Sequence, residues 1–276
     1  MSILIICLNH LLAKNCLSLE DAGKRGLVKL IIKSKGGFTG DVIEMKIKNL
    51  KKQNLELMLE AGRRLDSKNQ NEQDILVTKE QEFVLNSEQF ITINVTGMCC
   101  QAGNSCPSKN SEYSIGKMAD TNLIKLAAFI DANKYYNSFA AQQAVWSISD
   151  HKSIGGINDG DAAITESLKK YVSKITGRPI PKYDVSYERQ SPQEVLGHVK
   201  TIDGIFEYDL SANGHVTIAI YNSTGRLVQT LIQDIPHQKG FNRLYFTFRT
   251  SGLEQGRYLA KLQVDGKNEK EMPIEF

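Results

Sequence analysis

The middle of the chain begins with Gly97-Met98-Cys99-Cys100-Gln101-Ala102-Gly103-Asn104-Ser105-Cys106-Pro107 and ends with Ala141-Gln142-Gln143-Ala144-Val145-Trp146-Ser147-Ile148-Ser149-Asp150. Strand-like alternation precedes this region, and the first helical patterns occur inside it. The region holds three of the five cysteines and the only tryptophan of the chain. We therefore expect residues 97–150 to join a β-rich half to a helical part and to carry any chemistry that the protein has.

The residues before positions 97–107, which we call the cysteine loop, alternate between apolar and polar in short runs. Ile43, Met45 and Ile47 are separated by charged residues, which is the period of a half-buried strand. Similar runs recur as far as Val95, whereas residues 62–71 are polar and indicate a loop. About six short strands with polar turns between them predict an antiparallel β-sandwich.

About three helices are expected after the cysteine loop. Thr121 can cap the first helix, Ser138 opens the second, and Asp161 caps the third, because short oxygen-bearing side chains satisfy the free N–H groups at a helix start. Gly177 suits the left-handed position that ends a helix. We expect these helices to cover one edge or end of the sandwich.

Strand patterns return in the last part of the chain. Residues 178–196 contain three of the six prolines and are predicted to be a linker that joins neither sheet centrally, since proline lacks the N–H that a ladder needs. Asn213-Gly214 is a hairpin signal between two alternating runs. Residues 197–276 are predicted to be a second, smaller all-β domain.

Composition and the N-terminus bear on the compartment. Lys and Arg exceed Asp and Glu by 34 to 31, a net charge of +3, which is too balanced to indicate a nucleic-acid partner. The apolar run from Ile3 to Leu8 is typical of a secretory signal segment and too short for a transmembrane helix. Export is therefore predicted, with cleavage between Ser18 and Ala22.

Two stretches near the C-terminus resemble a known group of modules. They are Val216-Thr217-Ile218-Ala219-Ile220-Tyr221-Asn222-Ser223-Thr224-Gly225-Arg226-Leu227-Val228 and Gly252-Leu253-Glu254-Gln255-Gly256-Arg257-Tyr258. They resemble the immunoglobulin-like domain of flagellar hook-capping proteins and the related C-terminal sorting domain of type IX secretion in Bacteroidetes-type bacteria. The resemblance implies an immunoglobulin-like β-sandwich and secretion machinery as a partner. The predicted organisation is then a signal segment (1–22), a β-sandwich with a helical extension (23–177), a linker (178–196) and an immunoglobulin-like domain (197–276).

The run from Ala141 to Trp146 resembles the glutamine motif of bacterial thioester domains, which occur in surface adhesins. The resemblance implies that a cysteine after a hydrophobic residue is joined to the glutamine side chain, which makes Cys99 and Gln142 the candidate reactive pair. The family usually has an aromatic residue after its cysteine, and Cys100 stands there in this chain. The pairing requires the cysteine loop to pack against the helix bearing Gln142, and a group that polarises the amide carbonyl, which the sequence does not identify.

Other interpretations of the same residues stay open. Cys100–Cys106 or Cys99–Cys106 can form a disulfide, since each closes a short loop. The three cysteines with His151 could bind zinc, but they lack the paired spacing of known zinc sites. A Cys–His nucleophile using His151 lacks a third orienting group. The helix around Trp146 can also serve packing alone.

Three functions are consistent with these patterns. The first is a non-enzymatic, exported binding or structural protein that recognises a protein or cell-surface ligand, requires no cofactor or metal, and carries a C-terminal module for sorting or assembly. The second is an adhesin in which a Cys99–Gln142 thioester captures amines covalently. The third is a metal- or thiol-dependent enzyme built on the cysteine loop.

Overall fold

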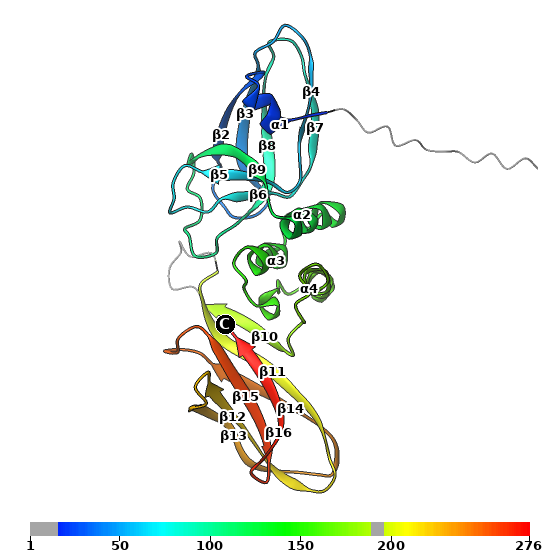
Figure 1. The fold of residues 1–276 in the computed structure, drawn as a ribbon, viewed down its shortest axis with the longest axis vertical. Helices are drawn as coiled ribbons and strands as arrows, with labels where there is room; N and C mark the ends of the chain where they lie inside the picture. The colour runs from blue at the N-terminus through cyan, green and yellow to red at the C-terminus, as the bar shows by residue number, and fades with distance from the viewer. Residues whose placement is uncertain (1–15, 189–195) are drawn as a thin grey trace, which may run out of the picture.

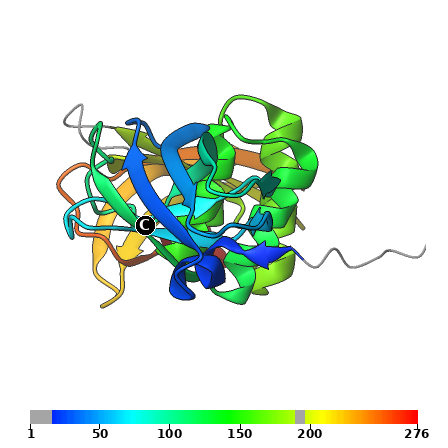
Figure 2. The same ribbon diagram turned by 90° about the horizontal axis from the view of Figure 1, so that it is seen from above.

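The computed structural model describes residues 16–188 and 196–276. Three parts follow one another along its long axis: a barrel with a small extra sheet, a group of helices, and a pair of sheets at the C-terminal end (Figure 1). Seen along that axis, the helices lie to one side (Figure 2). The protein is therefore mainly β with a helical insert, as the sequence predicts.

The N-terminal strands form a closed barrel where the sequence predicts a two-sheet sandwich. In spatial order the barrel strands are β2 (Val28–Ser34), β3 (Asp41–Asn49), β8 (Phe90–Cys99), β6 (Ile75–Val77), β5 (Arg63–Ser67) and β9 (Glu112–Met118). Strand β9 closes the barrel because Tyr113 pairs with Ile32 of β2 while Ile115 pairs with Leu65 of β5. A separate sheet of β1 (Leu17–Ser18), β4 (Leu55–Leu59) and β7 (Gln81–Leu85) shares the barrel's apolar core.

Strand β5 lies within residues 62–71, which the sequence predicts to be a polar loop. The side chain of Arg63 is buried there, and its guanidinium contacts the carboxylates of Glu60 and Glu20 and the backbone oxygen of Gly116. A buried charge is tolerated when it is paired and hydrogen-bonded. A polar stretch therefore forms β5, a barrel strand with a neighbour on each side. The hydrophobic pattern of this stretch alone does not predict a strand.

The N-terminal segment continues into the fold. Residues 1–15 of the predicted signal segment lie outside the described residues. Strand β1 pairs with β4, and helix α1 (Leu19–Lys24) buries Leu19 and Ala22 completely. Cleavage after Ala22, at the end of the predicted range, would remove both side chains from the barrel core, so residues 17–22 belong structurally with the part that follows.

The helices begin and end close to where the sequence places them. They are α2 (Thr121–Asn133), α3 (Phe139–Ser149), the short 3-10 helix η1 (Ile154–Gly156) and α4 (Ala162–Thr176). Ser138, Asp161 and Gly177 occupy the predicted cap positions. The first helix differs by one residue, because Asp120 accepts hydrogen bonds from Asn122 N and Leu123 N. The helices share a core that reaches the barrel through β6 and β8.

The C-terminal part consists of two antiparallel sheets around one core. One sheet has the order β10 (Tyr183–Glu188), β11 (His198–Leu210), β14 (Gly240–Arg249), and the other β13 (Leu227–His237), β12 (Gly214–Asn222), β15 (Arg257–Val264), β16 (Lys267–Glu275). Edge strand β10 lies inside the predicted linker. Asn213-Gly214 joins β11 to β12 across the two sheets and so is not a hairpin turn, since Leu210 pairs with Gly240 of β14 and Val216 with Ile235 of β13.

Candidate functional site

The two residues of the predicted reactive pair meet at the junction of barrel and helices. Cys99 is the last residue of β8, and Gln142 lies in the first turn of α3. The Cys99 N–H donates to Oε1 of Gln142 at 2.9 Å, and Nε2 of Gln142 donates to the Cys99 carbonyl at 2.7 Å. Neither residue has any exposed surface. The side-chain amide is thus held in one orientation against the cysteine.

A set of buried hydrogen bonds around Gln73 holds helix α3 in this position. Trp146 lies one helical turn beyond Gln142, and its indole N–H donates to Oε1 of Gln73 at 3.1 Å. Nε2 of Gln73 in turn donates to the carbonyl of Asn104 in the cysteine loop at 3.0 Å, and Tyr113 donates to the Gln73 carbonyl at 2.8 Å. Helix α3 and the cysteine loop are therefore both hydrogen-bonded to the fully buried side chain of Gln73. The cysteine loop thus packs against the helix that bears Gln142.

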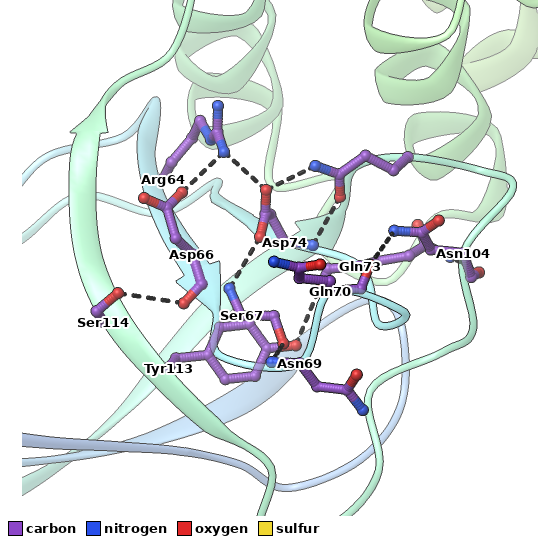
Figure 3. A network of polar contacts seen from close by, with 11 residues as sticks. Arg64, Asp66, Ser67, Asn69, Gln70, Gln73, Asp74, Asn104, Tyr113 and Ser114 are labelled. Carbon is purple, nitrogen blue, oxygen red and sulfur yellow. Dashed lines mark hydrogen bonds and ion pairs between the residues drawn. The ribbon is translucent and has the colours of Figure 1, made fainter.

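A second polar network fixes the base of the cysteine loop (Figure 3). The carboxylate of Asp74 accepts from the Arg64 guanidinium at 2.7 Å, from Nε2 of Gln101 at 2.6 Å and from the backbone N–H of Ser67 at 2.8 Å. Oε1 of Gln101 accepts the Asp74 N–H at 2.8 Å, and the Asp74 carbonyl accepts the Cys100 N–H at 2.8 Å. These bonds tie the first residues after Cys99 to the barrel wall and limit how far the cysteine can move.

Aromatic side chains surround the site. Phe38 meets Phe139 edge to face at 5.8 Å between ring centroids, and Phe139 meets Trp146 at 6.3 Å. Phe38 belongs to the turn between β2 and β3, whose Gly40 carbonyl accepts the Gly97 N–H at 2.9 Å. The Cys99 N–H, which donates to Gln142, also donates to the Phe38 carbonyl, with 3.3 Å between nitrogen and oxygen. This apolar cover keeps bulk water away from the Cys99–Gln142 contact.

Neighbouring cysteines point into different cores, because successive residues of a strand face opposite sides. Cys99 packs in the barrel core and Cys100 in the helix core. The four described cysteines, Cys16, Cys99, Cys100 and Cys106, are all thiols. Neither disulfide that the sequence leaves open is therefore formed, and Cys100 faces away from the core against which Cys106 packs.

The thiols differ in their surroundings. The pKa of the Cys99 thiol is raised well above its usual range, first by a hydrogen bond to Cys106 and then by burial. Burial raises the pKa of the Cys100 thiol to about 12. Reactive cysteines as a rule are accessible and have a lowered pKa. Cys99 is thus unsuited to attack an external substrate as a free thiolate, and its chemistry is restricted to groups already beside it.

His151 does not join the cysteines. It is exposed and lines a cavity of about 620 Å³ between the helices and the C-terminal sheets, together with Arg178 and Tyr183. No cysteine is among the described residues that line this cavity. Within residues 16–188 and 196–276, no three His, Cys, Asp or Glu side chains gather as a metal site would require. The predicted zinc and Cys–His alternatives find no geometric support.

The group that polarises the Gln142 carbonyl is the backbone N–H of Cys99 itself. This donor nitrogen lies 2.9 Å from the oxygen of the intact amide, so it is placed to stabilise negative charge that develops on that oxygen. The sequence could not identify this donor, because almost every residue has a backbone N–H. The direction in which the Cys99 N–H points depends on where β8 ends and on where α3 packs. Sequence reasoning also missed Gln73, a single glutamine in a polar stretch with no distinguishing pattern.

None of the protein-family models compared with the chain matches it, and none of the curated proteins does either. The chemistry of the site is therefore inferred from its residues: a buried cysteine, and a buried primary amide that two hydrogen bonds hold against the backbone of that cysteine, one of them donated to the amide oxygen.

Proposed function

We propose that this protein captures amines covalently through an internal thioester between Cys99 and Gln142. The observation that carries the proposal is the reciprocal pair of hydrogen bonds that holds the Gln142 amide against Cys99 in a fully buried site. Proximity and fixed orientation are worth several kcal/mol of a reaction barrier. A buried amide with one geometry is well placed for attack by the thiol of the residue that binds it.

The proposed reaction balances without a cofactor. Sγ of Cys99 attacks Cδ of Gln142, negative charge develops on Oε1, and the Cys99 N–H stabilises that charge. The thiol proton passes to Nε2, which leaves as ammonia, and the acyl group remains on sulfur. An amine then attacks the carbonyl carbon, a C–N bond forms, and the thiol of Cys99 is released. The aromatic cover slows competing hydrolysis until an amine enters.

The intact mass of the purified chain tests this proposal. We expect a mass lower than the sequence requires by one ammonia, and the addition of one methylamine after treatment with that amine. Peptide mapping should join the peptides that contain Cys99 and Gln142. Cys99→Ala and Gln142→Ala should abolish both effects, whereas Gln143→Ala, which removes the next buried amide of α3, should retain them. A full mass with no methylamine adduct would overturn the proposal.

A non-covalent binding or structural role is the second candidate, and a specific observation favours it. Both polar atoms of the Gln142 side chain have partners, and together they satisfy the N–H and C=O of the last residue of β8. An amide can be buried for that reason alone, since unpaired backbone groups are costly. In this case Gln142→Ala would reduce stability and leave ligand binding by the folded protein unchanged.

We also infer that the protein is exported and that its two C-terminal sheets are an immunoglobulin-like module for sorting or assembly. The support is the resemblance of residues 216–228 and 252–258 to such modules, together with seven antiparallel strands in two sheets around one core. No helix in the described parts of the chain is long and apolar enough to cross a membrane. Protease treatment of intact producing cells should degrade the protein; protection until lysis would refute export.

A further inference from the structure

A second thiol lies beside the proposed acyl-bearing cysteine. Cys106 belongs to the loop between β8 and β9, is half-buried, and packs against the core that contains Cys99. The two thiols are hydrogen-bonded. Backbone bonds hold this part of the loop in place: Ser105 donates to the Asn71 carbonyl at 2.9 Å and accepts from Gln73 N at 3.1 Å. The approach of Cys106 to Cys99 is thus part of the fold.

We infer that Cys106 is the redox partner of Cys99 and that a Cys99–Cys106 disulfide excludes the Cys99–Gln142 thioester, so that oxidation controls amine capture. This inference rests on the proposed function. One sulfur atom cannot be bonded to an acyl carbon and to a second sulfur at the same time. The seven-residue separation closes a short loop, and the hydrogen bond between the two thiols places their sulfur atoms next to each other.

The oxidant that the inference requires is a low-molecular-weight disulfide. Cys106 is the accessible member of the pair, so it attacks the small disulfide first and releases one small thiol, forming a mixed disulfide. Cys99 then attacks the sulfur of Cys106, and the second small thiol leaves. The two protein thiols are oxidised and the small disulfide is reduced to two thiols. The raised pKa of Cys99 makes the second step slow, whereas its contact with Cys106 makes it intramolecular.

The order of events gives the disulfide two effects. Oxidation before acyl transfer removes the Cys99 nucleophile, and no thioester forms. Oxidation after capture acts on the Cys99 thiol that the amine has just displaced. That thiol is the group that could attack the new amide and reverse the capture, so its oxidation makes the product permanent. A thioester that is intact has no free thiol at Cys99 and is unaffected.

The experiment has two arms so that the inference and the proposed function can fail separately. In the first, the reduced Gln142→Ala chain, which has no acyl donor, is treated with oxidised glutathione and mapped by mass spectrometry. We expect a Cys99–Cys106 bridge, its loss in Gln142→Ala/Cys106→Ser, and its retention in Gln142→Ala/Cys100→Ala, the matched control from the adjacent position. No bridge, or a bridge to Cys100, overturns the inference whether or not a thioester exists.

In the second arm the wild-type chain is produced unfolded and reduced, its full mass is checked to show that Gln142 still carries its amide, and it is then refolded with dithiothreitol or with oxidised glutathione before methylamine uptake is measured. We expect uptake with the reductant, loss of uptake with the oxidant, and recovery of uptake in Cys106→Ser under the oxidant. Equal uptake in both conditions overturns the inference and leaves the proposed function standing. Absence of methylamine uptake even with the reductant overturns the proposed function, and the inferred redox control of that function then falls as well.

Discussion

Opening the proposed Cys99–Gln142 thioester with methylamine should lower the free energy of unfolding by about 3 kcal/mol. The thioester would be a covalent link between residues 43 positions apart. In the chain-entropy model a cross-link closing such a loop stabilises a protein by about 4 kcal/mol, between the values for loops of about 15 and about 100 residues. The methylamine product is again an amide and regains an N–H donor for the Cys99 carbonyl, which offsets about 1 kcal/mol.

Trp146 supplies the assay, because it is the only tryptophan and is fully buried beside the site. Its fluorescence is followed during urea unfolding of treated and untreated protein in an amine-free reducing buffer, and the mass of each sample is checked afterwards. With a denaturant slope of about 3 kcal/mol/M, the midpoint should fall by about 1 M on treatment.

Cys99→Ala is the control for this measurement. Its hydrogen bonds to Gln142 use backbone atoms and survive the substitution, but no cross-link can form. We expect it to unfold near the midpoint of treated wild-type protein and to be insensitive to methylamine. An adduct in the wild-type mass spectrum without any shift of the midpoint would refute the reasoning that the thioester closes a loop in the folded chain.

Three further predictions concern stability. In the Cys99→Ala chain, which cannot form the thioester, Gln142→Leu should cost about 2–3 kcal/mol in urea unfolding, because the buried backbone carbonyl of residue 99 loses its donor. Gln143→Leu loses one hydrogen bond from Asn158 N and should cost about 1 kcal/mol in the same measurement. Arg63→Met should cost about 2–3 kcal/mol, because the half-buried carboxylate of Glu60 loses an ion-pair partner and the Gly116 carbonyl loses a donor; Lys68→Met breaks an exposed pair and should change the same measurement little. Since the folded pKa of Cys100 is raised to about 12, the folded chain keeps a proton that the unfolded chain loses above pH ~8.5. Stability should fall as pH rises beyond that value, and less steeply in Cys100→Ala, as urea titrations at several alkaline pH values would measure.

The sequence predicts those features that depend on neighbouring residues. Ser138, Asp161 and Gly177 stand at helix ends because of chemistry within one turn. The alternation of Ile43, Met45 and Ile47 likewise predicts a strand with one buried face, which β3 has. Both kinds of signal are local, and their positions hold to within about a residue or two.

Features that depend on distant contacts could not be predicted. Barrel closure requires β9 to pair with both β2 and β5, and β5 is concealed by a polar sequence whose buried arginine finds its carboxylates only in the fold. Pairing among the cysteines depends on the face that each occupies. The period of two places Cys99 and Cys100 in different cores, but the core that Cys106 approaches depends on the loop after β8.

The division of the molecule into three parts bears on how capture would operate. The barrel provides the end of a rigid strand, the helices provide the amide, and the Gln73–Trp146 hydrogen bond fixes one against the other. The C-terminal sheets lie at the opposite end of the long axis from the barrel (Figure 1), and the bonds that fix the reactive pair involve none of their strands. Covalent capture and attachment to a surface or secretion apparatus would therefore be separable: substitutions in the sheets should alter where the protein is held, and substitutions at Cys99 or Gln142 should alter what it retains.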